Sequence, residues 1–138
     1  MDAGTRIRHL AGRDAFVRNL GAELVDAGSG HAVVELVVAP GHLNFNGTCH
    51  GGVVFALADT AFGLASNSHE AVAAAIDAHI SFPAPARQGD RLTASAKEVT
   101  RSSRLAVYRV DVTRADGALV GVFTGTVYIT KSKHDGSS

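Results

Sequence analysis

The chain has 138 residues, a length typical of one domain that can bury a hydrophobic core. Its 13 basic and 13 acidic residues balance, so no net charge draws it to nucleic acid or to an anionic membrane. The single cysteine, Cys49, excludes an intrachain disulfide framework and fits a reducing compartment. Because we see no long apolar span and no signal-peptide pattern, we expect one cytoplasmic domain over residues 1–138.

The first forty residues predict a short helix and a β-hairpin. Residues 1–11 show no clear periodicity, and we expect them to be flexible, as we do the polar residues 131–138. Residues 12–20 have the apolar spacing of a short helix. Strands are predicted at residues 23–27 and 31–39, separated by a Gly-Ser-Gly turn.

An almost wholly apolar segment follows and predicts one long helix that ends near Asn67. From Asn44 the chain reads NFNGTCHGGVVFALADTAFGLASN. A helix that is apolar on every face is normally buried, so we expect its one ionisable residue, Asp59, to be buried with it. Because burying a carboxylate is costly and shifts its pKa, Asp59 is a candidate for function.

Alternating apolar residues predict four more strands, at residues 72–82, 92–99, 105–113 and 119–129. Two strands, one long helix and four strands indicate an α+β fold in which a curved antiparallel sheet wraps around the helix. Gly121 and Gly125 share one face of the last strand, and we expect them to leave gaps where another backbone can approach. Apolar groups on the outer face of the sheet predict that another subunit covers it.

The residues His50-Gly51-Gly52 lie where the long helix should begin. Free N–H groups and the positive end of the helix dipole attract an oxygen that carries negative charge. This point is therefore a candidate oxyanion site for a carbonyl under attack. The alternative is that Gly51 and Gly52 only permit the turn and close packing.

Asp59 lies eight residues beyond Gly51, about 12 Å along a helix axis. A single reacting bond cannot touch both groups of one chain at that separation. If both serve one reaction, they must come from two antiparallel chains, so the sequence predicts a dimer whose interface builds the site.

Asp59 has aromatic and small residues one helical turn away on either side. Phe55, Phe62 and Gly63 would form a slot beside the carboxylate that suits an apolar or aromatic acyl group. The alternative is a structural Asp that accepts hydrogen bonds from backbone groups or from Thr60.

Three polar features near the helix start have competing interpretations. Asn44 and Asn46 could hold a substrate or a water molecule, or could form Asx turns. Cys49 beside His50 could be a thiol nucleophile, but adjacent residues seldom point at each other and a small buried cysteine is the simpler interpretation.

Metal and nucleotide sites find little support in the sequence. Asp77 and His79 share a strand face but do not make a ligand set, so no metal is expected. No dinucleotide or P-loop glycine motif is present. Four basic residues could meet phosphates or could form an ordinary charged rim: Arg101, Arg104, Lys131 and Lys133.

The run HLNFNGTCHGGVVFALADTAFGLASN resembles the signature of hotdog-fold acyl-CoA thioesterases. It is most similar to the phenylacetic-acid-degradation type, the (hydroxy)phenylacetyl-CoA thioesterases. The similarity continues through FPAPARQGD to VFTGTV and covers most of the chain.

This resemblance implies a hotdog fold, a homodimer that forms the active site, and a homotetramer. It implies that the Gly51 N–H polarises the thioester carbonyl and that Asp59 of the facing subunit acts as general base or nucleophile. Asn44 would hold the thioester or the water, and His50 would line the pocket near the sulfur. No cofactor is implied, because coenzyme A is part of the substrate. The residues expected to contact substrate are Gly52, Phe55, Thr60, Phe62, Gly63, Arg101 and Arg104.

The sequence departs from some relatives of this type at one point. They carry a hydroxyl residue on the strand after the helix to orient water, whereas this chain has Ala73-Ala74-Ala75 there. Two alternatives to a thioesterase remain: a hotdog enoyl-CoA hydratase or dehydratase, and a non-catalytic acyl-CoA-binding protein. The hydratase chemistry usually needs a His paired with an acid on the helix, which offers only Asp59.

Overall fold

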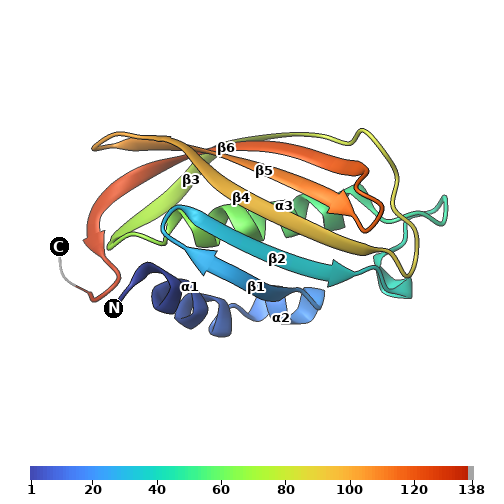
Figure 1. Ribbon diagram of the computed structural model, residues 1–138, viewed down its shortest axis with the longest axis horizontal. Coiled ribbons are helices and arrows are strands. Elements are labelled where there is room, and N and C mark those ends of the chain that lie inside the picture. Colours follow the sequence, from blue (N-terminus) through green and yellow to red (C-terminus); the bar gives the residue numbers. More distant parts are fainter. Residues whose placement is uncertain (137–138) are drawn as a thin grey trace.

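A six-stranded antiparallel sheet and one long helix make up most of the fold (Figure 1). The computed structural model describes residues 1–136 of the chain. The helices are α1 (Ala3–Gly12), α2 (Ala15–Leu20) and α3 (Gly51–Ser66), with a short 3-10 turn, η1 (Pro40–His42). The strands are β1 (Glu23–Gly28), β2 (His31–Val37), β3 (Ala71–Ser81), β4 (Arg91–Arg101), β5 (Leu105–Arg114) and β6 (Leu119–Lys133). This order confirms the predicted α+β arrangement of two strands, a long helix and four strands.

The strands lie in the order β1-β2-β4-β5-β6-β3, and each neighbouring pair is antiparallel. Strand β3 is therefore an edge strand that pairs only with β6. Residues 74–79 of β3 are all exposed in the single chain. The predicted alternation along β3 is interrupted, because the register with β6 shifts between Ala75 and Asp77.

One face of α3 packs against the sheet and forms the centre of the core. The ring of Phe62 lies 5.3 Å from the ring of Phe123 and 5.9 Å from that of Tyr108, measured between centroids. Directly beneath that ring is Gly125, where an added Cβ would come within 2.7 Å of Phe62. Val54 stands in the same way over Gly121, at 3.0 Å from such a Cβ. The gaps left by the two glycines are therefore filled by helix side chains, and the prediction that another backbone approaches there is wrong.

The other face of α3 is open in the single chain. Gly52 and Asp59 are exposed, and Phe55, Thr60 and Gly63 are only partly buried. The expectation that α3 and Asp59 are buried on all sides is wrong. The sheet curves around one side of the helix only, and α1 and α2 reach just part of the remaining side (Figure 1).

The chain termini contain more regular structure than expected. Residues 1–11 show no clear pattern, yet most of them belong to α1, whose N-cap Asp2 accepts a hydrogen bond from the Thr5 N–H at 2.8 Å. Ile7 is fully buried and anchors this helix. At the other end β6 continues to Lys133, and residues 137–138 of the expected flexible tail lie outside the described residues. Within residues 1–136, no helix is long and apolar enough to cross a membrane.

The contact between Phe62 and Gly125 gives a stability prediction. We expect Gly125→Ala to lower the free energy of unfolding by about 1–3 kcal/mol, because the new methyl group collides with a ring that the core holds in place. Gly28→Ala in β1 is the matched control, since nothing lies within 4 Å of its added Cβ. Urea unfolding of both variants measures the difference, and equal stabilities would contradict the proposed fit.

Candidate active site

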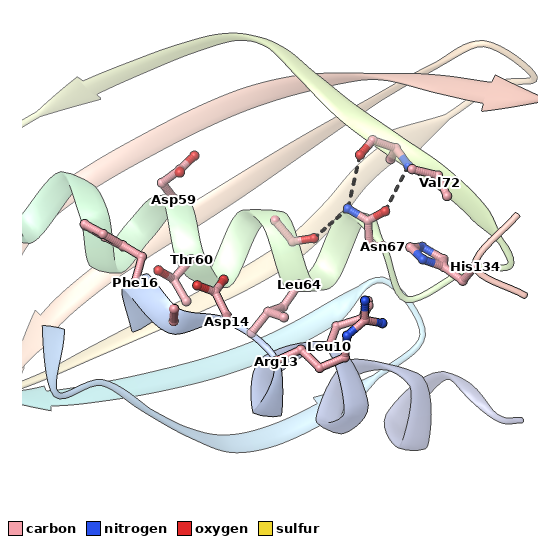
Figure 2. Close-up of a pocket in the computed structure, with 13 residues that line it drawn as sticks. Leu10, Arg13, Asp14, Phe16, Asp59, Thr60, Leu64, Asn67, Val72 and His134 are labelled. Atoms are coloured by element: carbon pink, nitrogen blue, oxygen red, sulfur yellow. Dashed lines mark hydrogen bonds between the residues drawn. The ribbon is translucent and has the colours of Figure 1, made fainter. Parts of the chain in front are cut away.

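A groove of about 710 Å³ runs along the open face of α3 and contains Asp59 (Figure 2). One wall consists of Arg13 and Asp14, which join α1 to α2, and of Phe16 of α2. Thr60 and Gly63 of α3 form the floor together with the C-cap residue Asn67, and the start of β3 together with His134 closes the far end. The groove thus brings together residues from both ends of the chain and from its middle.

The Asp59 carboxylate projects from α3 without a protein partner. No donor in the described part of the chain hydrogen-bonds to it. The Thr60 hydroxyl, which could have held it, instead donates to the Ala56 carbonyl at 2.7 Å. The interpretation of Asp59 as a structural residue held by Thr60 is therefore wrong.

The surroundings of Asp59 disfavour its charged form. Although Asp59 is exposed as a residue, the groove removes part of the water around its carboxyl group and raises the pKa of that group above its ordinary value, and the negative charge of Asp14 raises it further. Asp14 stays in place because its carboxylate caps α2, accepting from the Val17 N–H at 3.1 Å. A carboxylate with a raised pKa and no hydrogen-bond donor is a stronger base than an ordinary surface Asp.

The N-terminus of α3 has two N–H groups with different roles. The His50 side chain is the N-cap, and its Nδ1 accepts from the Gly52 N–H at 2.8 Å. The Gly51 N–H has no acceptor among residues 1–136 and remains available. The Phe82 ring lies beside it, with its Cζ 3.4 Å from where a Gly51 Cβ would be. A free N–H at the positive end of a helix dipole, next to an apolar ring, suits a carbonyl oxygen.

Gly51 and Asp59 open into different cavities of the single chain. Gly51 lines a cavity of about 320 Å³ together with Cys49 and Phe82, whereas Asp59 lies in the larger groove. The two groups are separated by eight helical residues, or about 12 Å along the axis of α3. One chain therefore does not bring both to a single reacting bond.

The loop before α3 holds Asn44 in an Asx turn. Its side-chain oxygen accepts from the N–H of Asn46 at 2.9 Å and of Thr48 at 3.2 Å. Because the oxygen is engaged within the loop, only the side-chain NH₂ group of Asn44 can serve a ligand.

Cys49 is buried, and burial, together with the charge of Asp90, raises the pKa of its thiol. A thiol kept protonated is a poor nucleophile, which argues against the cysteine mechanism.

The two aromatic residues expected beside Asp59 face the core instead. Phe62 is 1% exposed, and the Phe55 ring packs on Phe123 at 5.6 Å between centroids, so neither lines the groove. The aromatic residue that does line it is Phe16 of α2, which is 60% exposed. Periodicity around α3 places residues on faces but does not reveal which face the sheet occupies, so the choice between these aromatic residues could not be made from sequence.

Arg101 and Arg104 line neither cavity. Arg104 donates to the Tyr128 hydroxyl at 3.3 Å. Arg101 is the last residue of β4 and lies near Tyr108, whereas the loop that leads to η1 lies at the opposite end of β4. Arg13, Asp14 and His134, which do line the groove, carried no sequence signal, because only the fold brings them to α3.

Throughout the described residues, no three His, Cys, Asp or Glu side chains gather so that they could hold a metal ion.

Comparisons with known proteins agree on one group. Residues 46–121 match the family described as the thioesterase superfamily. The acyl-coenzyme A thioesterase PaaI of Escherichia coli is 37% identical over 112 residues, which cover 81% of this chain and 80% of that protein. The solved structure of E. coli PaaI, from the phenylacetic acid degradation operon, matches with a TM-score of 0.91 over 94% of each chain at 32% identity.

Two further solved structures are also similar. A Thermus thermophilus protein is 44% identical, with a TM-score of 0.83 over 86% of this chain and 99% of that chain. A Streptococcus mutans protein, solved bound to acetyl-CoA, is 29% identical, with a TM-score of 0.76 over 79% of this chain and 88% of that chain.

The raised pKa of Asp59 predicts how stability depends on pH. A carboxyl group whose pKa is higher in the folded chain than in the unfolded chain holds its proton more tightly when the chain is folded. As the pH rises from the unfolded-state pKa through the folded-state pKa, this group therefore lowers the stability of the folded chain. We expect Asp59→Asn, which has no charge to desolvate, to melt at a higher temperature than the wild type at pH 7. The difference should vanish in acid below the unfolded pKa. Thermal melts of the variant and the wild type across pH test this. If the stability of the variant relative to the wild type were lower at pH 7 than at pH 4, the prediction would be contradicted.

Proposed function

We propose that this chain, which belongs to the thioesterase superfamily of hotdog-fold acyl-CoA thioesterases, hydrolyses arylacetyl-CoA and completes each active site with a second copy of itself. The match to PaaI confirms the hotdog fold, and the family makes the chain a thioester hydrolase. The acetyl-CoA bound to the S. mutans relative supports a coenzyme A thioester as the substrate class. The proposed reaction requires no metal and no cofactor.

The observation that carries the proposal is the separation of two unpartnered groups on one helix. The Gly51 N–H can polarise a carbonyl, and the Asp59 carboxylate can take a proton, but they lie about 12 Å apart along α3. A two-fold axis that sets two α3 helices antiparallel would bring Gly51 of one chain to Asp59 of the other, twice. Two complete sites then arise from two incomplete ones.

The free edge of the sheet offers the surface for such a pairing. Residues 74–79 of β3 are exposed and include Ile76, which is 58% exposed. An open edge with exposed apolar side chains is a template for another strand. Antiparallel pairing of two β3 strands would join the sheets and place both α3 helices on the same side of the joined sheet. A homotetramer of two such dimers completes the proposed assembly.

In the proposed mechanism, the thioester carbonyl accepts a hydrogen bond from the Gly51 N–H. The Asp59 carboxylate of the facing copy takes a proton from a water molecule, whose oxygen attacks the carbonyl carbon. The negative charge that develops on the carbonyl oxygen is stabilised by the N–H and the helix dipole. When the tetrahedral intermediate collapses, the carbon–sulfur bond breaks and the proton passes from Asp59 to the coenzyme A thiolate. The Asn44 NH₂ group is free to hold the thioester or the water, and His50 flanks the entrance.

The groove beside Asp59 supports an aryl or apolar acyl group. Phe16 and Leu64 provide apolar walls, and Gly63 leaves the floor without a side chain. In this proposal Gly52, Thr60 and Gly63 contact the substrate, whereas Phe55 and Phe62 only support the helix from the core side. Arg101 and Arg104 would contact the nucleotide only if the partner copy brought it to them.

Removal of either unpartnered group should abolish turnover. We expect Asp59→Asn to lower kcat for phenylacetyl-CoA by at least about a hundredfold while the oligomer stays intact, since a general base contributes on that scale. Thiol release measures turnover, and size-exclusion chromatography checks assembly. Full activity in Asp59→Asn would exclude Asp59 as the base. Cys49→Ala is the control, and its inactivity would restore the thiol mechanism.

Gly51→Pro removes the N–H at the first helical position, where proline is well tolerated, and Gly51→Ala keeps it. We expect the proline variant to lose most activity and the alanine variant to keep most of it. Equal amounts of the inactive Asp59→Asn and Gly51→Pro chains, refolded together, should regain about a quarter of wild-type activity. Random pairing makes half of the dimers mixed, and each mixed dimer has one intact site of its two. No recovery would show that both groups act within one chain.

A further inference from the structure

The groove continues well beyond Asp59, and its far end has a different chemistry. In Figure 2, Phe16 and Asp59 lie at one end, while Arg13 and His134 lie at the other. Leu64 lies between the two ends, and Leu10 and Val72 add apolar side chains beside Arg13 and His134. An acyl chain that starts at Asp59 and follows this stretch would end at Arg13 and His134.

The far end has hydrogen-bonding groups that the protein itself does not use. His134 Nε2 is buried and has no partner among residues 1–136, and the Arg13 guanidinium makes no hydrogen bond or ion pair there. Asn67, by contrast, is fully engaged: its NH₂ donates to the carbonyls of Gly63 and Ala73, and its oxygen accepts from the Ala73 N–H. Asn67 is thus a fixed wall, whereas Arg13 and His134 keep hydrogen-bonding groups that no other residue of 1–136 uses.

The far end of the groove carries the cationic side chain of Arg13. A second cavity of about 270 Å³ adjoins it through Leu10, Arg13 and His134, and charges of both signs line the rest of that cavity: Arg6, Lys133, Glu70 and Asp135. Burial lowers the pKa of His134, with a further contribution from the charge of Arg6, so the ring is neutral and one of its nitrogens keeps a proton to donate. The opposite end holds the carboxyls of Asp14 and Asp59. A ligand with a negative group at its far end therefore matches the groove in one direction only.

The length of the groove sets the length of that ligand. Asp59 and Asn67 are eight residues apart on α3 and its C-cap, or about 12 Å along the axis. An extended chain advances about 1.2 Å per bond, so the distance corresponds to roughly eight to ten bonds. A phenylacetyl group ends short of Arg13 and His134, whereas a medium-length acyl chain reaches them.

We propose that the far end of the groove selects acyl thioesters whose acyl chain is of medium length and ends in a carboxylate, which Arg13 and His134 bind. This inference rests on the proposed thioesterase function and adds a second substrate class to it. The Arg13 guanidinium pairs with the carboxylate through parallel N–H donors, and His134 Nε2–H donates to the same group. Pairing also removes the cost of a buried imidazole nitrogen without a partner.

The test compares two thioesters of equal chain length that differ only at the far end: octanoyl-CoA and its ω-carboxylated counterpart, 7-carboxyheptanoyl-CoA. We expect kcat/KM of the wild type to be higher for the carboxylated substrate by about tenfold or more, the scale of one charge-assisted hydrogen bond. Phenylacetyl-CoA serves as the reference that shows whether the enzyme is active at all.

Two variants and one matched control locate the effect. Arg13→Met and His134→Phe should each reduce the carboxylated-to-octanoyl ratio of kcat/KM by about tenfold, because each removes a donor and keeps an apolar side chain of similar size. Lys97→Met removes the same charge as Arg13→Met but from an exposed residue of β4 that lines neither the groove nor the adjoining cavity, so its ratio should equal that of the wild type.

The outcomes separate the inference from the function on which it rests. Hydrolysis of phenylacetyl-CoA with a wild-type ratio near one would overturn the inference and leave the thioesterase intact. A ratio that falls equally in Lys97→Met would also overturn it, because the preference would then come from general charge. Absence of hydrolysis with every thioester would remove the proposed function and the inference together.

Discussion

The packing of Phe62 on Gly125 fixes the rotation of α3, and the candidate site depends on that rotation. The ring has no room to move, because it also contacts Phe123 and Tyr108. Asp59, three residues earlier, is turned about 60° from Phe62 around the helix axis, just past the edge of the buried face. A slip of the helix by one residue would turn the carboxylate by about 100° and carry it out of the groove. The position of the acid is therefore set by a glycine on β6.

The same helix divides its terminal N–H groups between structure and chemistry. His50 satisfies the Gly52 N–H through its own ring, which stabilises the first turn without help from a ligand. The Gly51 N–H has no acceptor among residues 1–136, so it stays available to a substrate carbonyl. Since α3 is held rigidly on the sheet, this donor does not have to reorganise when charge develops on a bound carbonyl. The rigid core and the reactive end of the helix are thus two consequences of one packing arrangement.

The sequence predicts the elements of the fold well because their signals are local. Alternating residues specify the strands, and the apolar run specifies α3, with Asp59 and Gly51 standing out as groups without an obvious structural use. What the sequence could not predict is contact between distant segments. The aromatic residue beside Asp59 is Phe16 rather than Phe62, and this depends on where α2 and the sheet lie around α3. Helix α1 was missed because only Ile7 of its residues is fully buried, so its periodic signal is weak.

Partial desolvation of the Asp59 carboxyl group by the groove has two effects. Removing water from the carboxylate disfavours its charge, which lowers the stability of the folded chain at neutral pH and raises the pKa of the group. A base becomes stronger as its pKa rises toward the working pH, provided that it is still ionised there. A second chain that covered the groove would remove more water, and it would bring the free Gly51 N–H and a bound thioester to the same carboxylate. Dimerisation would then complete the site and, in the same step, make the Asp59 carboxylate a stronger base. The same loss of solvent would therefore favour both assembly and catalysis.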